Sequence, residues 1–186
     1  MLIQLADFLI KAVGSFFLGL FLFRFYCLLI KCNLSLVGGN LSQFIFKLTD
    51  WSVLPLRKVL PKSGNFDLST FLSALGIQYL MVFAHYLLLT GQLPDFFLLI
   101  VSLFDLISFA ISALTWLVII YAISSWVSLK DEIRYFFDRL VFPLLSPIRK
   151  VIPPISGLDL SAFFLLLALQ LINIVVINYK YMLFGA

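Results

Sequence analysis

The sequence predicts an all-α integral membrane protein with four transmembrane helices in two parallel repeats. Three observations lead to this prediction. The 186 residues are 63% hydrophobic and 12% charged, with a mean hydropathy of +1.12, whereas soluble domains have about 45–50% apolar and about 25% charged residues. Long apolar runs alternate with basic segments, as expected of helices that cross a bilayer. One basic, proline-containing stretch also occurs twice, 92 residues apart.

Four apolar segments are long enough to cross a hydrocarbon core of about 30 Å, which takes about 20 helical residues. The predicted spans cover about residues 12–30, 68–90, 106–128 and 160–177. The third apolar run begins earlier, at Phe96, and contains a single charge, Asp105. We place Asp105 at the outer boundary, so that residues 96–104 either lie in the interface or extend the helix outward. The first run is too long for a signal peptide and lacks a basic start, so we interpret it as a retained helix.

The cations predict the orientation of the spans. Ten of the thirteen lie in the segments that follow the first and third spans: Lys31, Lys47, Arg57, Lys58, Lys62, Lys130, Arg134, Arg139, Arg149 and Lys150. The short turn between the second and third spans carries Asp95 and no cation. By the positive-inside rule both basic segments are cytoplasmic, and both termini lie outside.

Each cytoplasmic segment contains an amphipathic pattern, at about residues 41–54 and 132–145. Apolar residues recur at helical spacing, in the first at Leu41, Phe44, Ile45, Leu48 and Trp51, and in the second at Ile133, Phe136, Phe137, Leu140, Val141 and Leu144. The pattern predicts helices that lie in the membrane interface. The alternative is a helix packed on a soluble core, but the chain has too little polar sequence to build one.

The doubled stretch reveals a duplication. Residues 55–69, PLRKVLPKSGNFDLS, align without a gap with residues 147–161, PIRKVIPPISGLDLS, and eight of the fifteen positions are identical. We therefore predict repeats at residues 1–93 and 94–186, each made of a span, an interfacial helix, a basic turn and a span. Because each repeat has two spans, the second starts on the same side as the first, and an axis along the membrane normal relates them.

The duplicated motif comprises, in the two repeats, Pro55, Arg57, Lys58, Pro61, Asp67 and Ser69, and Pro147, Arg149, Lys150, Pro153, Asp159 and Ser161. We expect the prolines to end regular helix and the cations to lie at headgroup depth. The aspartates are expected to cap the spans that follow them. The motif is then either a structural turn, a docking site for lipid headgroups or a partner, or a turn closed by an Arg–Asp pair.

Polar residues within the predicted spans need partners. Arg24 lies about 5 Å on the cytoplasmic side of the middle of the first span, and of the two solutions, snorkelling to the headgroups or pairing internally, we favour snorkelling. Gln78 and Gln170 each lie about 15 Å into their spans. We expect the two amides to meet across the repeat interface, with Asn173 nearby; local bonds, contacts in an oligomer and a pore lining are the alternatives.

The sequence contains no pattern typical of an enzyme. It has one histidine, His85, no acid pair and no phosphate-binding loop, so neither catalysis nor a metal or cofactor site is expected. Cys27 and Cys32 match no zinc or redox motif and are interpreted as ordinary residues at a helix end. The net charge of +4 is interpreted as a topological signal, and no nucleic-acid partner is expected.

The doubled pattern reads Pro, then Leu or Ile, Arg, Lys, Val, again Leu or Ile, and Pro, and Asp-Leu-Ser follows it at the start of a span. It resembles the YggT/YlmG family of small bacterial inner-membrane proteins. Arg24 and Ser125-Trp126 match two further family positions. The chain departs from the pattern at Leu28-Leu29, at Tyr121 and at Trp51, whereas Pro143 keeps the proline that Trp51 replaces. The resemblance implies an inner-membrane location, and a divergence of the two halves.

The resemblance also implies an association with osmotic-stress tolerance and ion homeostasis, with cell division and nucleoid distribution, or, in plastids, with haem attachment to a cytochrome. Two functions fit the residues. The first is a non-enzymatic scaffold or assembly factor that binds membrane lipids and a membrane-protein partner or a second copy of itself. The second is a small oligomeric channel or transporter.

Overall fold

The computed structural model describes residues 1–32, 39–60, 66–93, 96–124, 131–150 and 160–184. These ranges form six helices and no strand: α1 (Leu2–Leu29), α2 (Gly39–Val59), α3 (Leu68–Thr90), α4 (Phe97–Ser124), α5 (Asp131–Arg149) and α6 (Ser161–Phe184). Four of the six helices, α1, α3, α4 and α6, are long and apolar enough to cross a membrane. The predicted all-helical architecture with four candidate spans is therefore confirmed.

The described chain divides into two compact units. Unit 1 contains α1, α2, α3 and the start of α4 up to Ile107, and unit 2 contains the remainder of α4 from Ser108, with α5 and α6. Each unit thus includes one of the two amphipathic helices, α2 or α5, which precedes the last candidate span of its repeat in the chain.

The candidate spans follow the apolar runs of the sequence. The bounds of α3, Leu68–Thr90, coincide with the predicted span, and the helix ends at Gly91, whose φ of 67° allows its N–H to bond the carbonyl of Leu87. The helix α4 is continuous from Phe97, so residues 97–104 are part of the third helix. At 28 residues it is about 42 Å long, and tilt accommodates part of that length in a bilayer.

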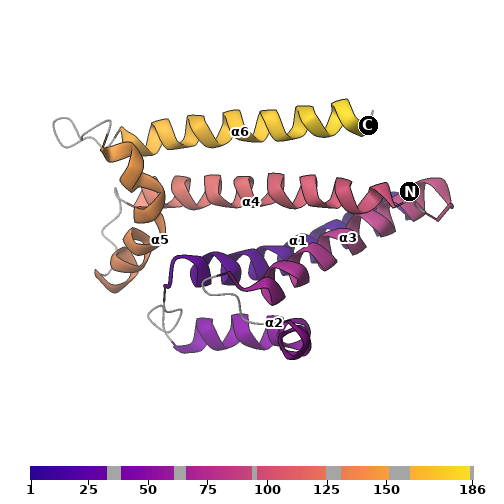
Figure 1. The fold of residues 1–186 in the computed structure, drawn as a ribbon, viewed down its shortest axis with the longest axis horizontal. Coiled ribbons are helices and arrows are strands. Elements are labelled where there is room, and N and C mark those ends of the chain that lie inside the picture. Colours follow the sequence, from indigo (N-terminus) through magenta and orange to yellow (C-terminus); the bar gives the residue numbers. More distant parts are fainter. Residues whose placement is uncertain (33–38, 61–65, 94–95, 125–130, 151–159, 185–186) are drawn as a thin grey trace. The chain divides into compact units, whose positions relative to one another are not determined.

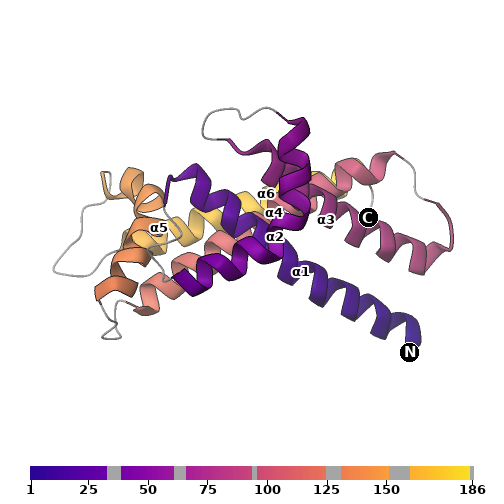
Figure 2. The same ribbon diagram turned by 90° about the horizontal axis from the view of Figure 1, so that it is seen from below.

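The amphipathic helices extend further than expected, because the prolines do not end them. Pro55 lies inside α2, and Pro143 and Pro147 lie inside α5. The helical pattern continues beyond Pro55, where the N–H of Leu60 bonds the carbonyl of Leu56 at 2.9 Å. A proline removes one backbone bond and bends the helix, and Figures 1 and 2 show that α2 bends along its length. Pro61 and Pro153 lie outside the described residues.

Each unit has its own core. In unit 1, α1 and α3 pack side by side (Figure 1), with Leu18, Phe21 and Ala74 fully buried. In unit 2, α5 lies across the direction of α6 (Figure 2) and packs against it. The fully buried side chains of α5 are those of Leu140, Val141 and Leu145.

Candidate functional site

Arg24, the cation of the first candidate span, is buried in unit 1. Its side chain is 2% exposed, and Nη1 donates hydrogen bonds to the hydroxyl of Thr49 and, at 2.7 Å, to a carboxylate oxygen of Asp50. Both partners belong to α2. The prediction of snorkelling was therefore wrong. Arg24 takes the internal ion pair instead, because the amphipathic helix brings an acid to it.

The surroundings of the Arg24 guanidinium stabilise its charge. Cζ lies 4.9 Å from the centroid of the Phe46 ring, within the range of cation–π attraction. The Thr49 hydroxyl donates its own proton to the carbonyl of Ile45 at 2.7 Å, which leaves its oxygen free to accept from Arg24. The Arg24 Nε finds no partner among the described residues. The ion pair with Asp50 is thus the main compensation for burying this cation.

Two further contacts join α2 to α3. The hydroxyl of Ser52 donates to that of Ser73 at 3.0 Å, and Ser73 donates to the carbonyl of Ser69 at 2.8 Å. Near the end of α2, Arg57 forms a hydrogen-bonded ion pair with Asp67. This pair is the Arg–Asp closure that the sequence left open as one interpretation of the motif. In the described chain, α2 is therefore attached both to α1 and to the N-terminal part of α3.

Asp67 occupies the N-cap position of α3, but its side chain makes no capping bond. Its Oδ2 accepts from Arg57 and, at 2.8 Å, from the hydroxyl of Thr70. The predicted capping hydrogen bond of Asp67 is therefore not formed, and Oδ2 binds these two side chains instead. Burial raises the pKa of Asp67, but the hydrogen bonds from Arg57 and Thr70 outweigh it and leave that pKa below its ordinary value. Asp159, its counterpart, lies outside the described residues.

The exposed face of α2 is apolar and basic. Phe44, Trp51 and Leu54 are 49%, 61% and 49% exposed, and Lys47 and Lys58 are exposed as well. The buried face of the same helix carries Ser42, Ile45, Thr49 and Val53. The polar contacts of α2 thus lie on its protein-facing side, and its large apolar side chains lie on the outside.

The amphipathic helix of the second repeat buries the equivalent position, but without a buried cation. At the shift of 92 residues, Val141 replaces Thr49 and Phe142 replaces Asp50. Thr49 and Val141 are both 0% exposed, so the same position is buried in each repeat. Tyr121 stands where an arginine was expected, and its hydroxyl accepts a bond of 3.4 Å from Arg149 Nη2. The buried Arg24–Asp50 pair therefore belongs to the first repeat.

The remaining motif residues lie near the ends of the amphipathic helices and candidate spans. Pro55 and Pro147 are exposed on α2 and α5, and Lys150 is exposed just after α5. Ser69 and Ser161, which occupy equivalent positions, are 3% and 0% exposed. The two serines therefore pack inside their units.

The intramembrane amides have different surroundings. Gln78 is buried and Gln170 is exposed in the described chain. Asn173, one turn after Gln170, accepts a hydrogen bond of 2.7 Å from the hydroxyl of Ser108, which joins α6 to α4 within unit 2. That the two glutamines meet stays a prediction.

A polar cluster that we did not predict from the sequence lies at the end of unit 1 away from α2. The carboxylate of Asp7 contacts His85 Nδ1 at 2.6 Å and Lys11 Nζ at 2.8 Å. Asp7 and His85 are 78 positions apart, and only the antiparallel packing of α1 on α3 brings them together. The signal was the presence of an acid near the N-terminal end of the first span and the histidine near the C-terminal end of the next. Cys27 and Cys32 are buried and not in a disulfide.

Comparison with known proteins gives the family. A family model described as CCB3/YggT matches residues 3–88 and 100–179, and these two segments fall in the two predicted repeats. This chain belongs to the CCB3/YggT family. The family match thus confirms the resemblance and the duplication that the doubled motif indicated.

Relatives in the CCB3/YggT family cover most of the chain. An uncharacterised protein of Pseudomonas aeruginosa is 33% identical over 177 residues, which is 93% of this chain and 88% of the relative. An uncharacterised protein of Vibrio alginolyticus is 40% identical over 135 residues, 71% of this chain and 73% of the relative. The uncharacterised protein YggT of Escherichia coli K12 is 34% identical over 133 residues, which is 71% of this chain and 69% of the relative. No solved structure matches the chain significantly.

Proposed function

We propose that this CCB3/YggT protein is a non-enzymatic membrane scaffold or assembly factor, and that α2 is its docking element. The observation that carries the proposal is the attachment of α2 by polar contacts on one side, at Arg24, Ser73 and Asp67. A helix held in this way presents Phe44, Trp51 and Leu54 outward in a fixed orientation. Fixed aromatic side chains are typical anchors of protein interfaces.

The membrane placement belongs to the same proposal. We infer that the protein lies in a bacterial inner membrane, with α2 and α5 in the cytoplasmic interface and both termini on the outer side. The distribution of the cations supports this orientation. An exposed face that combines Trp51 with Lys47 and Lys58 also suits the boundary between headgroups and acyl chains. The partners are then membrane lipids together with a membrane protein or a second copy of this chain.

The family resemblance suggests a physiological setting for the scaffold. We propose that it supports osmotic-stress tolerance, ion homeostasis or the organisation of the cell envelope during division. In this proposal the protein assembles other components and carries out no reaction itself.

Site-specific crosslinking in living cells tests the docking role of α2. A photoreactive phenylalanine analogue at Trp51 is expected to yield one discrete protein adduct, and the same probe at Leu89, which is 66% exposed at the end of α3, is expected to yield none. Asp50→Ala should weaken the adduct at Trp51, because it removes the ion pair between α2 and α1. Asp138→Ala, which removes an exposed acid of α5, is the matched variant that leaves the ion pair intact and should leave the adduct unchanged.

Two results would contradict the scaffold. One is a probe at Trp51 that reacts with lipid alone in cells that express all native partners. The other is ion flux through vesicles that contain the purified protein, abolished by Gln78→Leu or Gln170→Leu, which would favour the channel.

A further inference from the structure

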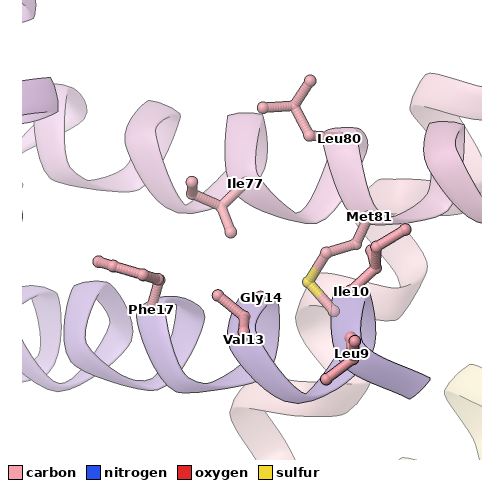
Figure 3. Close-up of a pocket in the computed structure, with 8 residues that line it drawn as sticks. All are labelled: Leu9, Ile10, Val13, Gly14, Phe17, Ile77, Leu80 and Met81. Atoms are coloured by element: carbon pink, nitrogen blue, oxygen red, sulfur yellow. The ribbon is translucent and has the colours of Figure 1, made fainter. Parts of the chain in front are cut away.

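An apolar groove runs between α1 and α3 at the end of unit 1 away from α2 (Figure 3). Its volume is about 430 Å³, which lies within the range of about 300–1,000 Å³ that is usual for small-molecule sites. The side chains around it include those of Ile10, Val13 and Phe17 from α1 and Leu80 and Met81 from α3. An occupant of the groove would thus contact hydrocarbon side chains along the whole length of the groove.

A glycine shapes this groove. A Cβ atom at Gly14 would lie 2.4 Å from Sδ of Met81, so the side chain of Met81 occupies the space that Gly14 leaves. Val13 and Leu80, at the rim, are 56% and 59% exposed. Neither helix closes the groove, and within unit 1 it opens to the surroundings of the chain.

The groove ends in polar groups on its outer side. Asp7 lies seven positions before Gly14, and His85 lies four positions after Met81, so each is on the same helix face as the groove. Lys11 is 51% exposed and donates to Asp7 at 2.8 Å. An ammonium group has three N–H donors, so beside the bond to Asp7 two donors of Lys11 are left for a ligand among the residues that the structure describes.

We propose that the groove binds one acyl chain of a glycerophospholipid, whose phosphate accepts hydrogen bonds from Lys11. The proposal rests on the membrane placement given above, in which Lys11 directly precedes the first predicted span and therefore lies at headgroup depth. The polar cluster at this end contains the Asp7 carboxylate, shared by Lys11 and His85, and within it the exposed Lys11 ammonium complements an anion attached to an acyl chain. An apolar helix from a second copy would fill the groove but would leave the donors of Lys11 unused. The ligand chemistry that fits both parts is a phospholipid.

Native mass spectrometry of the purified full-length protein tests this proposal. The probes are palmitoyl-oleoyl phosphatidylglycerol and the diacylglycerol with the same two chains, which lacks the phosphate. We expect one phosphatidylglycerol per chain to bind more tightly than the diacylglycerol. Leu80→Trp, which fills the groove from its rim, should weaken phosphatidylglycerol binding about tenfold. Lys11→Gln should weaken it about fivefold, as expected for the loss of one cation close to the phosphate, and Lys11→Arg should restore it.

The control variants separate the groove from the rest of the lipid-facing surface. Leu72→Trp places the same side chain on α3 at a position that is 38% exposed and outside the groove, and it should bind phosphatidylglycerol like the wild type. Equal affinities of wild type, Leu80→Trp and Lys11→Gln would overturn the proposal. So would a disulfide-linked dimer formed by Leu80→Cys in membranes, because a second copy would then cover the groove. Crosslinking at Trp51 is independent of both outcomes, so the scaffold and the lipid site can fail separately.

Discussion

The carboxylate of Asp50 lies 2.7 Å from the guanidinium of Arg24, and this pair joins an amphipathic helix to a candidate membrane span. Arg24 is among the most deeply buried side chains of the described protein, at 2% exposure, whereas Asp50 is 35% exposed. Asp50 therefore compensates for the burial of Arg24, since an unpaired cation is costly in a medium of low dielectric constant. We expect the position of α2 to depend on this pair.

Asp50→Ala tests the pair directly. The substitution leaves Arg24 buried with Thr49 as its remaining side-chain acceptor in the described chain. We expect the free energy of unfolding to fall by about 3 kcal/mol, the lower end of the range for removing one partner of a buried ion pair, because Asp50 is partly exposed. Thermal unfolding in detergent, followed by the fluorescence of the protein's tryptophans, measures the loss.

Asp138→Ala is the matched control for Asp50→Ala. Asp138 is exposed on the other amphipathic helix, α5, and its removal should change the free energy of unfolding by less than about 0.5 kcal/mol. Equal destabilisation by the two substitutions would show that the Arg24–Asp50 pair does not hold α2.

The spans could be predicted from the sequence because hydropathy is a local property of the chain. The bounds of α3 agree with the apolar run at residues 68–90, and the duplication follows from identical residues at a constant shift. The prolines led to a wrong prediction of where the amphipathic helices end. A proline costs a helix one backbone bond, and the remaining bonds on either side of Pro55 keep α2 intact.

The partners of the polar residues could not be predicted in the same way. Arg24 and Asp50 are 26 positions apart, and Asp7 and His85 are 78 apart. Which residues meet across such separations depends on the packing of whole helices, and periodicity contains no information about that packing. The sequence did restrict the possible partners of Arg24, since a buried cation needs an acid within reach, and Asp50 lies on the nearest amphipathic helix.

The Arg57–Asp67 pair predicts a dependence of stability on pH. The pKa of Asp67 is below its ordinary value, so the native state stabilises the ionised carboxylate. This contribution to the free energy of unfolding is complete above the unfolded pKa of about 3.9, and it is lost as the pH falls through the lower, folded pKa. We expect the melting temperature of the wild type to decrease as the pH falls below about 4.

Asp67→Asn identifies the share of Asp67 in that decrease. The variant lacks the titrating group, so its melting temperature should be lower than that of the wild type at pH 7, and the difference should shrink as the pH is lowered to 3. A difference that stays constant from pH 7 to pH 3 would show that the ionisation of Asp67 does not stabilise the fold.

Labelling of single cysteines tests the orientation of the spans. Cys27 and Cys32 are free and are first replaced by serine. New cysteines then replace Leu2 and Met182, which are 81% and 85% exposed, or Trp51 on α2. A maleimide that does not cross membranes should label the cysteines at positions 2 and 182 in spheroplasts, and that at position 51 only after permeabilisation. The reverse pattern would place the termini in the cytoplasm.

The close approach of Gly14 to Met81 predicts unequal effects for two substitutions within α1. A methyl group at position 14 would lie 2.4 Å from Sδ and 2.5 Å from Cγ of Met81, so Gly14→Ala must displace that flexible side chain and should stabilise the protein less than a glycine-to-alanine change in open space, or slightly destabilise it. Gly19 has no atom within 4 Å of the same position, and Gly19→Ala should stabilise the helix by about 0.5–1 kcal/mol through helix propensity. Thermal unfolding of both variants in one detergent makes the comparison. Met81→Ala removes the obstructing atoms, so Gly14→Ala should shift the melting temperature about as much as Gly19→Ala does in that background. If Gly14→Ala and Gly19→Ala shift the melting temperature in the same direction by the same amount, α1 and α3 do not pack closely at Gly14.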